Sequence, residues 1–144
     1  MNSTARAKQL VRQVLLADTS LHALVGAAIY TEHPRAPDAS SVAMPCVIVD
    51  FLGGAGGYQG GLQHLSFDLY TYSRTSQDEA DAAYDAAYTA LHAQRLASTV
   101  TLAGGGAANS TSGVAREATR PDAGWNEQVG GWWCRGKWIA STAG

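Results

Sequence analysis

Two segments of the chain carry apolar residues at the spacing that lines one face of a helix. The first stripe consists of Leu10, Val11, Val14 and Leu15. The second consists of Ala80, Ala83, Tyr84, Ala87, Tyr88 and Leu91. Recurrence three and four positions apart predicts amphipathic helices over 4–16 and 76–95. The longer one opens on Ser76-Gln77-Asp78-Glu79, which has the form of a capping box. Between them, Asp18 and Gly26 are placed to start and end a short helix.

Other segments carry the patterns of β-strands. Residues 46–51 are almost all apolar, which predicts a strand buried on both faces in the middle of a sheet. Residues 64–72 and 131–141 alternate between apolar and polar positions, as half-buried strands do. Residues 100–102 and 114–119 are weaker strand candidates. These elements predict an α+β fold: a mostly antiparallel sheet of about four strands with helices packed on one face.

Glycine-rich stretches separate several of these elements. We expect residues 53–61 and 103–113 to form flexible exposed loops, because runs of Gly, Ala, Ser and Asn cannot pack a core. The proline-containing segment 31–41 is also a loop by composition. A chain of 144 residues with 46% hydrophobic content is expected to fold as a single domain over residues 1–144.

Composition and charge exclude several classes of protein. A formal net charge of −2 argues against a protein that mainly neutralises nucleic-acid phosphate. No apolar run is long enough to cross a membrane, and the N-terminus lacks a secretory apolar region. We therefore expect no membrane association and an intracellular site of folding. Cys46 and Cys134 are expected to be buried, reduced thiols.

Motifs that carry chemistry are missing from the sequence. Neither glycine cluster has the G-x-G-x-x-G register or the Gly-Lys-Ser/Thr of a phosphate-binding loop, and there is no G-x-S-x-G elbow. The histidines are scattered along the chain, without the spacing of metal ligands. The carboxylates at the start of the second long helix are explained by capping. We expect a protein that is not an enzyme and holds no cofactor or metal.

The tryptophan cluster near the C-terminus has two readings. Alternation places Trp132 and Trp138 in the core and Trp133 on the opposite face, with Arg135 and Lys137. Trp133 is then either an anchor of a protein interface or the cover of a second small core. The basic pair is either solvated or matched to an acidic surface of a neighbour. Asp81 and Asp85 offer such a surface, in a head-to-tail contact between copies.

The order of elements resembles the tail-terminator, or tail-completion, proteins of long-tailed bacteriophages. The resemblance covers most of the chain and follows hydrophobicity and spacing. It rests on Asp18 with 21–26, Ile29-Tyr30, Met44-Pro45 with the apolar strand, Gly53-Gly54, the 65–73 strand, the helix ending near Leu91, and 116–122 with the closing strand. The 103–113 segment and the tryptophan cluster depart from the pattern.

This resemblance implies a structural virion protein that caps the tail tube as a ring, most simply a hexamer. Its expected partners are further copies of itself, the tail tube protein and the head–tail connector, with DNA only passing through the lumen. It would be assembled in the host cytoplasm and reside in the tail or neck of the virion. The expected contact residues of the first loop are Gly54, Gly56, Gly57, Tyr58 and Gln59. Two alternatives remain: another head–tail joining or tail-tube ring protein, and an unrelated α+β ligand-binding domain.

Overall fold

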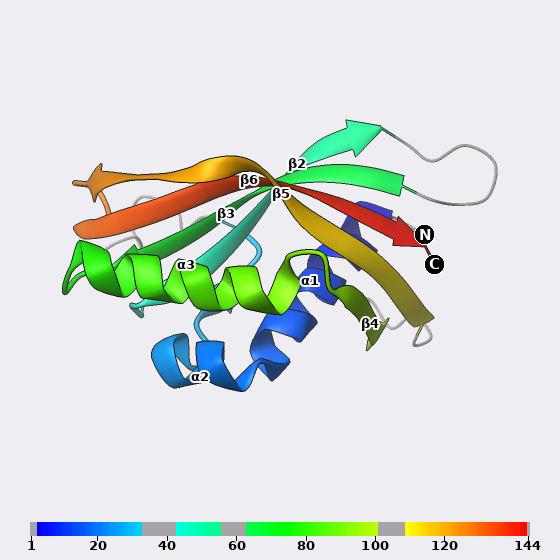
Figure 1. Cartoon of the computed structure of the whole chain (residues 1–144), viewed down its shortest axis with the longest axis horizontal. Helices are drawn as coiled ribbons and strands as arrows, with labels where there is room; N and C mark the ends of the chain where they lie inside the picture. Colours follow the sequence, from blue (N-terminus) through cyan, green and yellow to red (C-terminus); the bar gives the residue numbers. More distant parts are fainter. Residues whose placement is uncertain (1–2, 33–42, 56–62, 101–108, 144) are drawn as a thin grey trace.

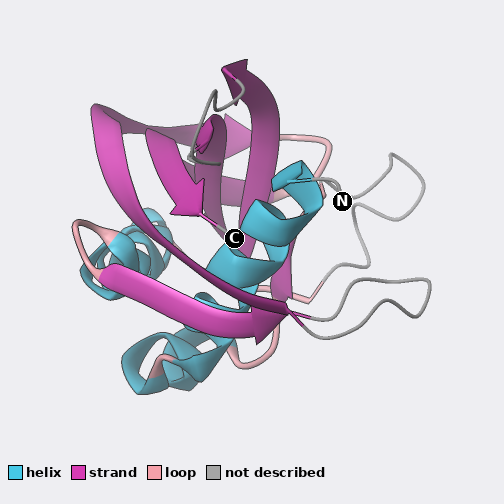
Figure 2. Cartoon of the chain, turned by 90° about the vertical axis from the view of Figure 1, so that its right-hand side faces the viewer, coloured by secondary structure: helices cyan, strands magenta, loops and turns pink. Residues whose placement is uncertain are grey.

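The computed structural model describes residues 3–32, 43–55, 63–100 and 109–143. Three helices are packed against one face of a curled, mixed sheet (Figures 1 and 2). The helices are α1 (Ser3–Ala17), α2 (Thr19–Val25) and α3 (Gln77–Leu91). The strands are β1 (Ile29–Tyr30), β2 (Cys46–Ala55), β3 (Gln63–Ser73), β4 (Arg95–Val100), β5 (Asn109–Asn126) and β6 (Gly131–Ala143).

The sheet is larger than the sequence predicts. Within the described residues it has six strands in the order β1-β2-β3-β6-β5-β4, rather than about four. The expected α+β class is confirmed. Every neighbouring pair is antiparallel except β1 with β2, and this parallel pair makes the sheet a mixed one. The additional strands are the two-residue β1 and the full-length β4, which form the two edges of the sheet.

Local sequence signals set the ends of α2 and α3 as expected. Asp18 accepts a hydrogen bond from the Leu21 amide at 2.8 Å, and Gly26 ends α2 with φ of 61°. Ser76 accepts from the Glu79 amide at 3.1 Å. In a capping box the Glu79 side chain would also bond to the Ser76 amide. Here Ser73 links these two groups, because its Oγ donates to Glu79 Oε1 and accepts from the Ser76 amide. The start of α3 is thereby tied to the end of β3.

Three boundaries differ from the prediction. Helix α3 ends at Leu91 rather than Arg95, because His92 turns to an extended conformation and Ala93 has φ of 56°. Arg95 therefore begins β4, which ends at Val100, the first residue of the short strand expected at 100–102; the other two residues of that expected strand lie outside the described residues. Strands β2 and β5 extend into the glycine-rich stretches, to Ala55 and from Asn109 respectively. The rest of those two expected loops, residues 56–61 and 103–108, lies outside the described residues, as do residues 33–41 of the third.

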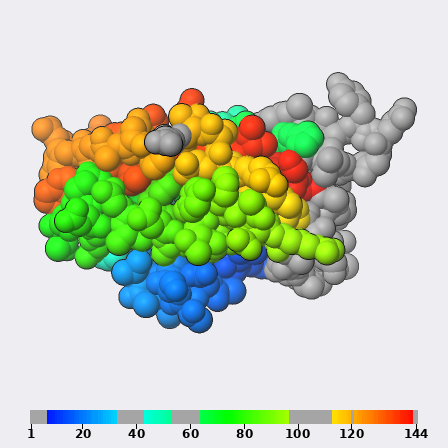
Figure 3. Space-filling model, in the orientation of Figure 1, coloured from blue at the N-terminus to red at the C-terminus, as the bar shows by residue number. Residues whose placement is uncertain are grey.

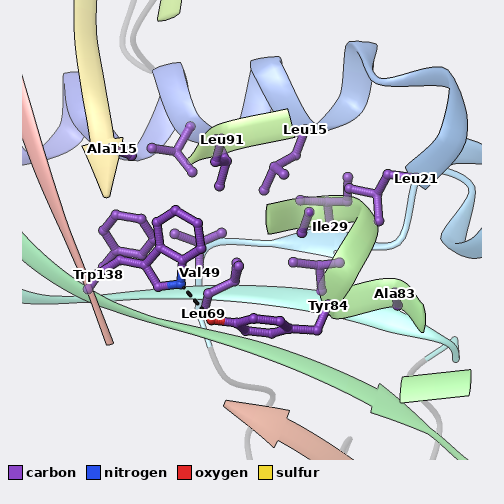
Figure 4. Close-up of a cluster of buried hydrophobic side chains, with 14 of the residues drawn as sticks. Leu15, Leu21, Ile29, Val49, Leu69, Ala83, Tyr84, Leu91, Ala115 and Trp138 are labelled. Atoms are coloured by element: carbon purple, nitrogen blue, oxygen red, sulfur yellow. Dashed lines mark hydrogen bonds between the residues drawn. The ribbon is translucent and has the colours of Figure 1, made fainter. Parts of the chain in front are cut away.

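The main core lies between the helices and the inner face of the sheet. Leu10, Val11 and Leu15 of α1 are fully buried, which confirms the first helical stripe. Phe67 and Leu69 of β3 belong to this cluster together with Trp138 of β6, and the ring centroids of Phe67 and Trp138 are 5.9 Å apart. Figure 4 shows Trp138 and Tyr84 pointing toward one another inside this cluster.

A smaller cluster covers part of the outer face of the sheet. Its buried members are Cys46, Ile48, Tyr72 and Val129. Tyr30, Met44, Tyr70 and Trp133 pack around them. Strand β2 is therefore buried on both faces from Cys46 to Val49, as its apolar sequence predicts. It is not central, because only the short β1 lies between it and the edge.

Candidate functional site

The predicted contact residues fall on two opposite faces of the sheet. Strand β6 directs Trp138 toward the helices and Trp133, Arg135 and Lys137 to the outer face. Asp81 and Asp85 lie on α3, which packs on the inner face beside β6 (Figure 3). The acidic and basic groups therefore cannot meet within one copy of the chain. Gly54 is in β2, paired with Leu65, whereas Gly56, Gly57, Tyr58 and Gln59 lie outside the described residues.

Arg135 is held in place by its own chain. Its guanidinium donates to Asp122 Oδ2 at 3.2 Å and lies 5.9 Å and 5.8 Å from the ring centroids of Tyr70 and Trp133. A hydrogen bond with Tyr70, followed by the charge of Asp122, raises the pKa of Arg135 above its usual value. With 34% of its side chain exposed, Arg135 remains available at the surface as a fixed, flat cation.

Trp133 covers the second cluster, as one of its two sequence readings proposed. It is half-buried against that cluster. Its ring also lies against Gly124 of the neighbouring strand, where an added Cβ would approach the ring to 2.8 Å. This packing fixes the indole and leaves one part of it exposed beside Arg135. The other reading, Trp133 as an interface anchor, stays a prediction.

Lys137 is exposed and lies across from a buried carboxylate. It lies opposite Asp68 in the β3–β6 register, and Asp68 is only 6% exposed. Asp68 Oδ1 is a buried side-chain oxygen without a hydrogen-bond partner. A lysine directly across the strand pair is suited to lie near that buried carboxylate.

The acidic residues on α3 differ in how freely they face solvent. Asp81 Oδ1 accepts from Gln77 Nε2 at 3.0 Å, and the same nitrogen donates to the Trp133 carbonyl at 3.0 Å. Asp81 is thereby used in docking the start of α3 onto β6. Asp85 is exposed, one turn further along the helix. Among the predicted contact residues that the structure describes, Asp85 and Lys137 are therefore the two with the most exposed charged side chains.

Several exposed apolar residues escaped the sequence reading. Leu52 on β2 and Ile139 on β6 are 59% and 42% exposed. Trp125 is 49% exposed and makes an edge-to-face contact with Trp132 at 4.7 Å. Trp125 belongs to a segment that composition did not mark as a strand, so its cross-strand partner could not be assigned. Exposed aromatic and aliphatic side chains of this kind are typical of protein interfaces.

One groove lies among the helices. It has a volume of about 520 Å³ and runs between the end of α1, the end of α3 and the start of β4. Val14 and Ala17 line one wall, and Ala90, Gln94 and Leu96 line the other. Asp18, at its end, is occupied by its hydrogen bond to Leu21. The groove combines apolar walls with side-chain amides and the Arg95 guanidinium.

Both cysteines are buried and unpaired, as expected. Burial raises the pKa of each thiol to about 12, and for Cys134 the charge of Asp81 adds to the effect. Because the thiolate is the reactive form, both thiols are protonated and inert near neutral pH.

We expect iodoacetamide at pH 8 to leave both cysteines unmodified in the folded protein and to alkylate both in guanidinium chloride. Intact-mass spectrometry counts the added groups. A Thr119→Cys variant, at an exposed position of β5, supplies the matched control and gains one group in the folded state. Labelling of Cys46 or Cys134 at the rate of that control would contradict the burial.

The described part of the chain has neither of two features that would indicate another functional class. No group of three His, Cys, Asp or Glu side chains is placed there to hold a metal ion. None of its helices has the length and apolar character needed to cross a membrane. The features that stand out on this α+β protein are the exposed apolar and charged side chains described above.

Comparison with known proteins gives the family. The family model described as "Tail completion protein gp17" matches residues 9–129, which is most of the chain. The chain therefore belongs to the gp17 family of tail completion proteins, and it is a structural component of a phage-like virion. No curated protein matches it in sequence.

A solved structure agrees with the fold. A chain described as "Virion of native gene transfer agent (GTA) particle" superposes with a TM-score of 0.65 over 99% of this chain and 100% of that one. The two share 23% sequence identity, so the similarity supports the fold and carries no residue roles.

Proposed function

We propose that this protein caps the tail tube as a ring of identical copies, ends tube growth and forms the joint to the head-side connector. Membership of the tail completion family carries the proposal. The arrangement of charge agrees with it, because Lys137 and Asp85 face opposite sides of the molecule and can pair only between copies. Contacts between different patches repeat around an axis and close into a ring when the rotation allows.

The end of the β2–β3 hairpin is the proposed contact to the tail tube or connector. Strands β2 and β3 extend together beyond the helices (Figure 1). The expected contact residues Gly56, Gly57, Tyr58 and Gln59 connect these strands in sequence. A ring placed between tube and connector needs projecting segments of this kind on its rim. DNA passes through the lumen, and the net charge of −2 is compatible with passage without tight binding.

The ring itself is tested by light scattering coupled to size exclusion, followed by negative-stain imaging. Six copies of the 15.0 kDa chain give a particle of about 90 kDa. We expect such rings either in solution or on the ends of purified tail tubes. A protein that remains monomeric in the presence of tubes and leaves their lengths unchanged would overturn the proposal. Long filaments of the protein alone would identify it instead as a tube subunit.

The hairpin contact is tested by replacing residues 56–63 with an Asn-Gly turn. Ala55 and His64 are register partners, so a two-residue turn fits between them and keeps the β2–β3 ladder. We expect an unchanged thermal unfolding curve and loss of tail completion, measured as joined particles in electron micrographs. A full-length variant carrying Tyr58→Ser and Gln59→Ser separates the side chains from the length of the loop. Normal joining by the shortened variant would exclude this contact.

A further inference from the structure

Two tryptophans form an exposed aromatic projection near the end of the β5–β6 hairpin. Trp125 of β5 and Trp132 of β6 are register partners, and their rings meet edge to face with centroids 4.7 Å apart. Trp132 is half-buried, whereas Trp125 is 49% exposed. Neither of them belongs to the two buried clusters. The Trp125 indole is therefore supported on one side by Trp132 and open to a partner on the other.

The tryptophan pair lies on the face of the sheet that carries the helices, beside the start of α3. Alternation along β6 puts Trp132 on the same face as Trp138 of the main core, and its register partner Trp125 shares that face. The start of α3 is docked next to this part of β6, because Gln77 Nε2 donates to the Trp133 carbonyl at 3.0 Å. Figure 1 shows the β5–β6 turn beside the beginning of α3.

The groove described above lies at the opposite end of the same helix. It is bordered by the ends of α1 and α3 and by the start of β4, which Figure 1 shows beyond the end of α3. The 15 residues of α3 separate the groove from the tryptophan pair by about 22 Å, so Trp125 cannot reach the groove of its own chain. Its volume of about 520 Å³ is in the range of pockets that enclose a small organic molecule, which leaves room for an indole.

The lining of the groove suits an indole in polarity. Val14, Ala90 and Leu96 provide apolar walls for the body of the ring. Gln94 also lines the groove, and its side-chain oxygen is able to accept a hydrogen bond from an indole N–H. A tryptophan inserted there has a place for both its apolar ring and its single donor.

The charges beside the two surfaces are opposite. Glu127 is exposed in the turn that ends the β5–β6 hairpin, two residues after Trp125. Arg95 is exposed at the start of β4 and lines the groove. A copy that brings Trp125 to the groove of another copy therefore also brings a carboxylate toward a guanidinium. A charge pair at the rim of a contact contributes orientation and choice of partner more than affinity.

We propose that Trp125 of one copy inserts into the groove between α1, α3 and β4 of the next copy, with Glu127 facing Arg95. The proposal rests on the ring proposed above and names the surfaces that close it. Because the projection and the groove lie at opposite ends of α3, each copy offers one of each and the contact repeats in one direction. The partner at this groove is a second copy of this chain.

A supported tryptophan is an effective anchor for such a contact. Tryptophan is enriched among the interface residues that carry most of the binding energy, because its large ring removes much apolar surface from water. Its few rotatable bonds also keep the entropic cost of fixing it low. The contact with Trp132 already orients the Trp125 ring in the single copy, which lowers this cost further.

Chemical cross-linking tests the contact in assembled rings or tails. Copies carrying Glu127→Cys are mixed with copies carrying Arg95→Cys, assembled and treated with a short bis-maleimide, while the native cysteines stay buried. We expect a covalent dimer at a yield roughly tenfold or more above that of Glu127→Cys mixed with Thr119→Cys, because a formed contact raises the effective concentration of the two thiols. Thr119 is exposed on β5 and does not line the groove, so it serves as the matched control.

The outcomes of this cross-linking separate the contact from the ring function. Rings or capped tails that give no more dimer than the control would overturn the inference and leave the ring function standing. Absence of the unmodified protein from completed tails would refute instead the function on which the inference rests.

Substitutions on the two surfaces test the same contact without a reagent. Trp125→Ala removes the inserted ring, and Ala90→Trp fills the groove while leaving Trp125 in place. Each is expected to weaken assembly into rings or capped tails by roughly tenfold or more, the usual effect of losing a central interface tryptophan. Ile139→Ala, at another exposed apolar position that does not line the groove, is expected to assemble normally. Circular dichroism checks that each variant is folded.

The pattern across these variants decides whether the groove receives Trp125. Normal assembly of a folded Trp125→Ala variant would refute the contact. Loss of assembly with Trp125→Ala but not with Ala90→Trp would show that Trp125 contacts a different surface, such as the tail tube, and would refute it as well.

Discussion

Replacing Gly136 by Ala is expected to lower the free energy of unfolding by about 2–3 kcal/mol, the usual cost of forcing an atom into a packed core. A Cβ on Gly136 would overlap the Tyr84 hydroxyl, which lies directly against that backbone. Tyr84 is 2% exposed and is a member of the main core, so it has no free space into which to move. Chemical denaturation monitored by circular dichroism measures the loss.

The hydroxyl cannot be displaced cheaply because it holds two partners. It accepts a hydrogen bond from Trp138 Nε1 at 2.9 Å and donates one to Glu117 Oε2 at 2.6 Å (Figure 4 shows the first). Burial, together with the Glu117 hydrogen bond, raises the pKa of Tyr84 and keeps this donor protonated. Moving the ring would leave buried polar groups unpaired.

Two variants separate the clash from other effects of the substitution. Gly26→Ala introduces the same methyl group where nothing lies within 4 Å, so its cost of about 1 kcal/mol reflects only the positive φ. Tyr84→Phe removes the overlapping oxygen, so Gly136→Ala should cost much less in that background than in the original chain. Equal costs in both backgrounds would show that the hydroxyl is not what Gly136 accommodates.

Leu21→Ala is expected to destabilise the protein by about 3 kcal/mol, the typical cost of truncating a fully buried leucine. Leu21 is 0% exposed and belongs to the main core, where it joins α2 to the rest of the molecule. Its removal leaves a cavity between α2 and its neighbours. Urea denaturation of the isolated protein gives the change in stability.

Leu24 supplies the matched control on the same helix. It lies three residues along α2 and is 39% exposed, so Leu24→Ala should change the free energy of unfolding by less than about 0.5 kcal/mol. Both changes replace Leu by Ala in α2, so helix propensity is the same in the two variants. Similar losses at the two positions would mean that α2 is not packed on the core as described.

The helices and the burial pattern could be predicted from sequence because their signals are local. Capping by Asp18 and Ser76 involves residues three apart, and both caps are formed. Alternation in 64–72 and 131–141 identified inward side chains such as Phe67 and Trp138. It was wrong for Trp132, which was expected in the core but is only half-buried and belongs to neither cluster, because it pairs with the exposed Trp125 near the end of the sheet. Each of these patterns depends only on the geometry of its own element.

The edges of the sheet could not be predicted, because pairing creates them. Arg95 and Leu96 continue an apparent helical pattern, and the left-handed conformation of Ala93 that ends α3 has no signature in that residue type. The first residues of β5, from Asn109 to Gly113, have the composition of a loop and become a strand through their register with β4 and β6. Strand propensity depends on such neighbours more than on the residues themselves.

The sequence predicted which face of the sheet carries the candidate contact residues of β6, but not the contacts that these residues make within the chain. Alternation correctly placed Trp133, Arg135 and Lys137 on the face opposite Trp138. It could not reveal that Asp122 already pairs with Arg135, because those residues are brought together by an irregular register between β5 and β6. It also missed Leu52, whose exposure follows from a register shift in β2 after Phe51.

The pairing of β3 with β6 at the centre of the sheet has a consequence for how the chain folds. Partners such as Tyr72 and Trp133 are far apart in sequence, and contacts of this kind form slowly because a long loop must close first. During synthesis, β2 and β3 leave the ribosome well before β6. Each new molecule therefore passes through a stage in which β2 and β3 are already made and β3 has an unpaired edge, because β6 has not yet been synthesised. Fast, complete maturation of single copies is accordingly a condition for orderly particle production.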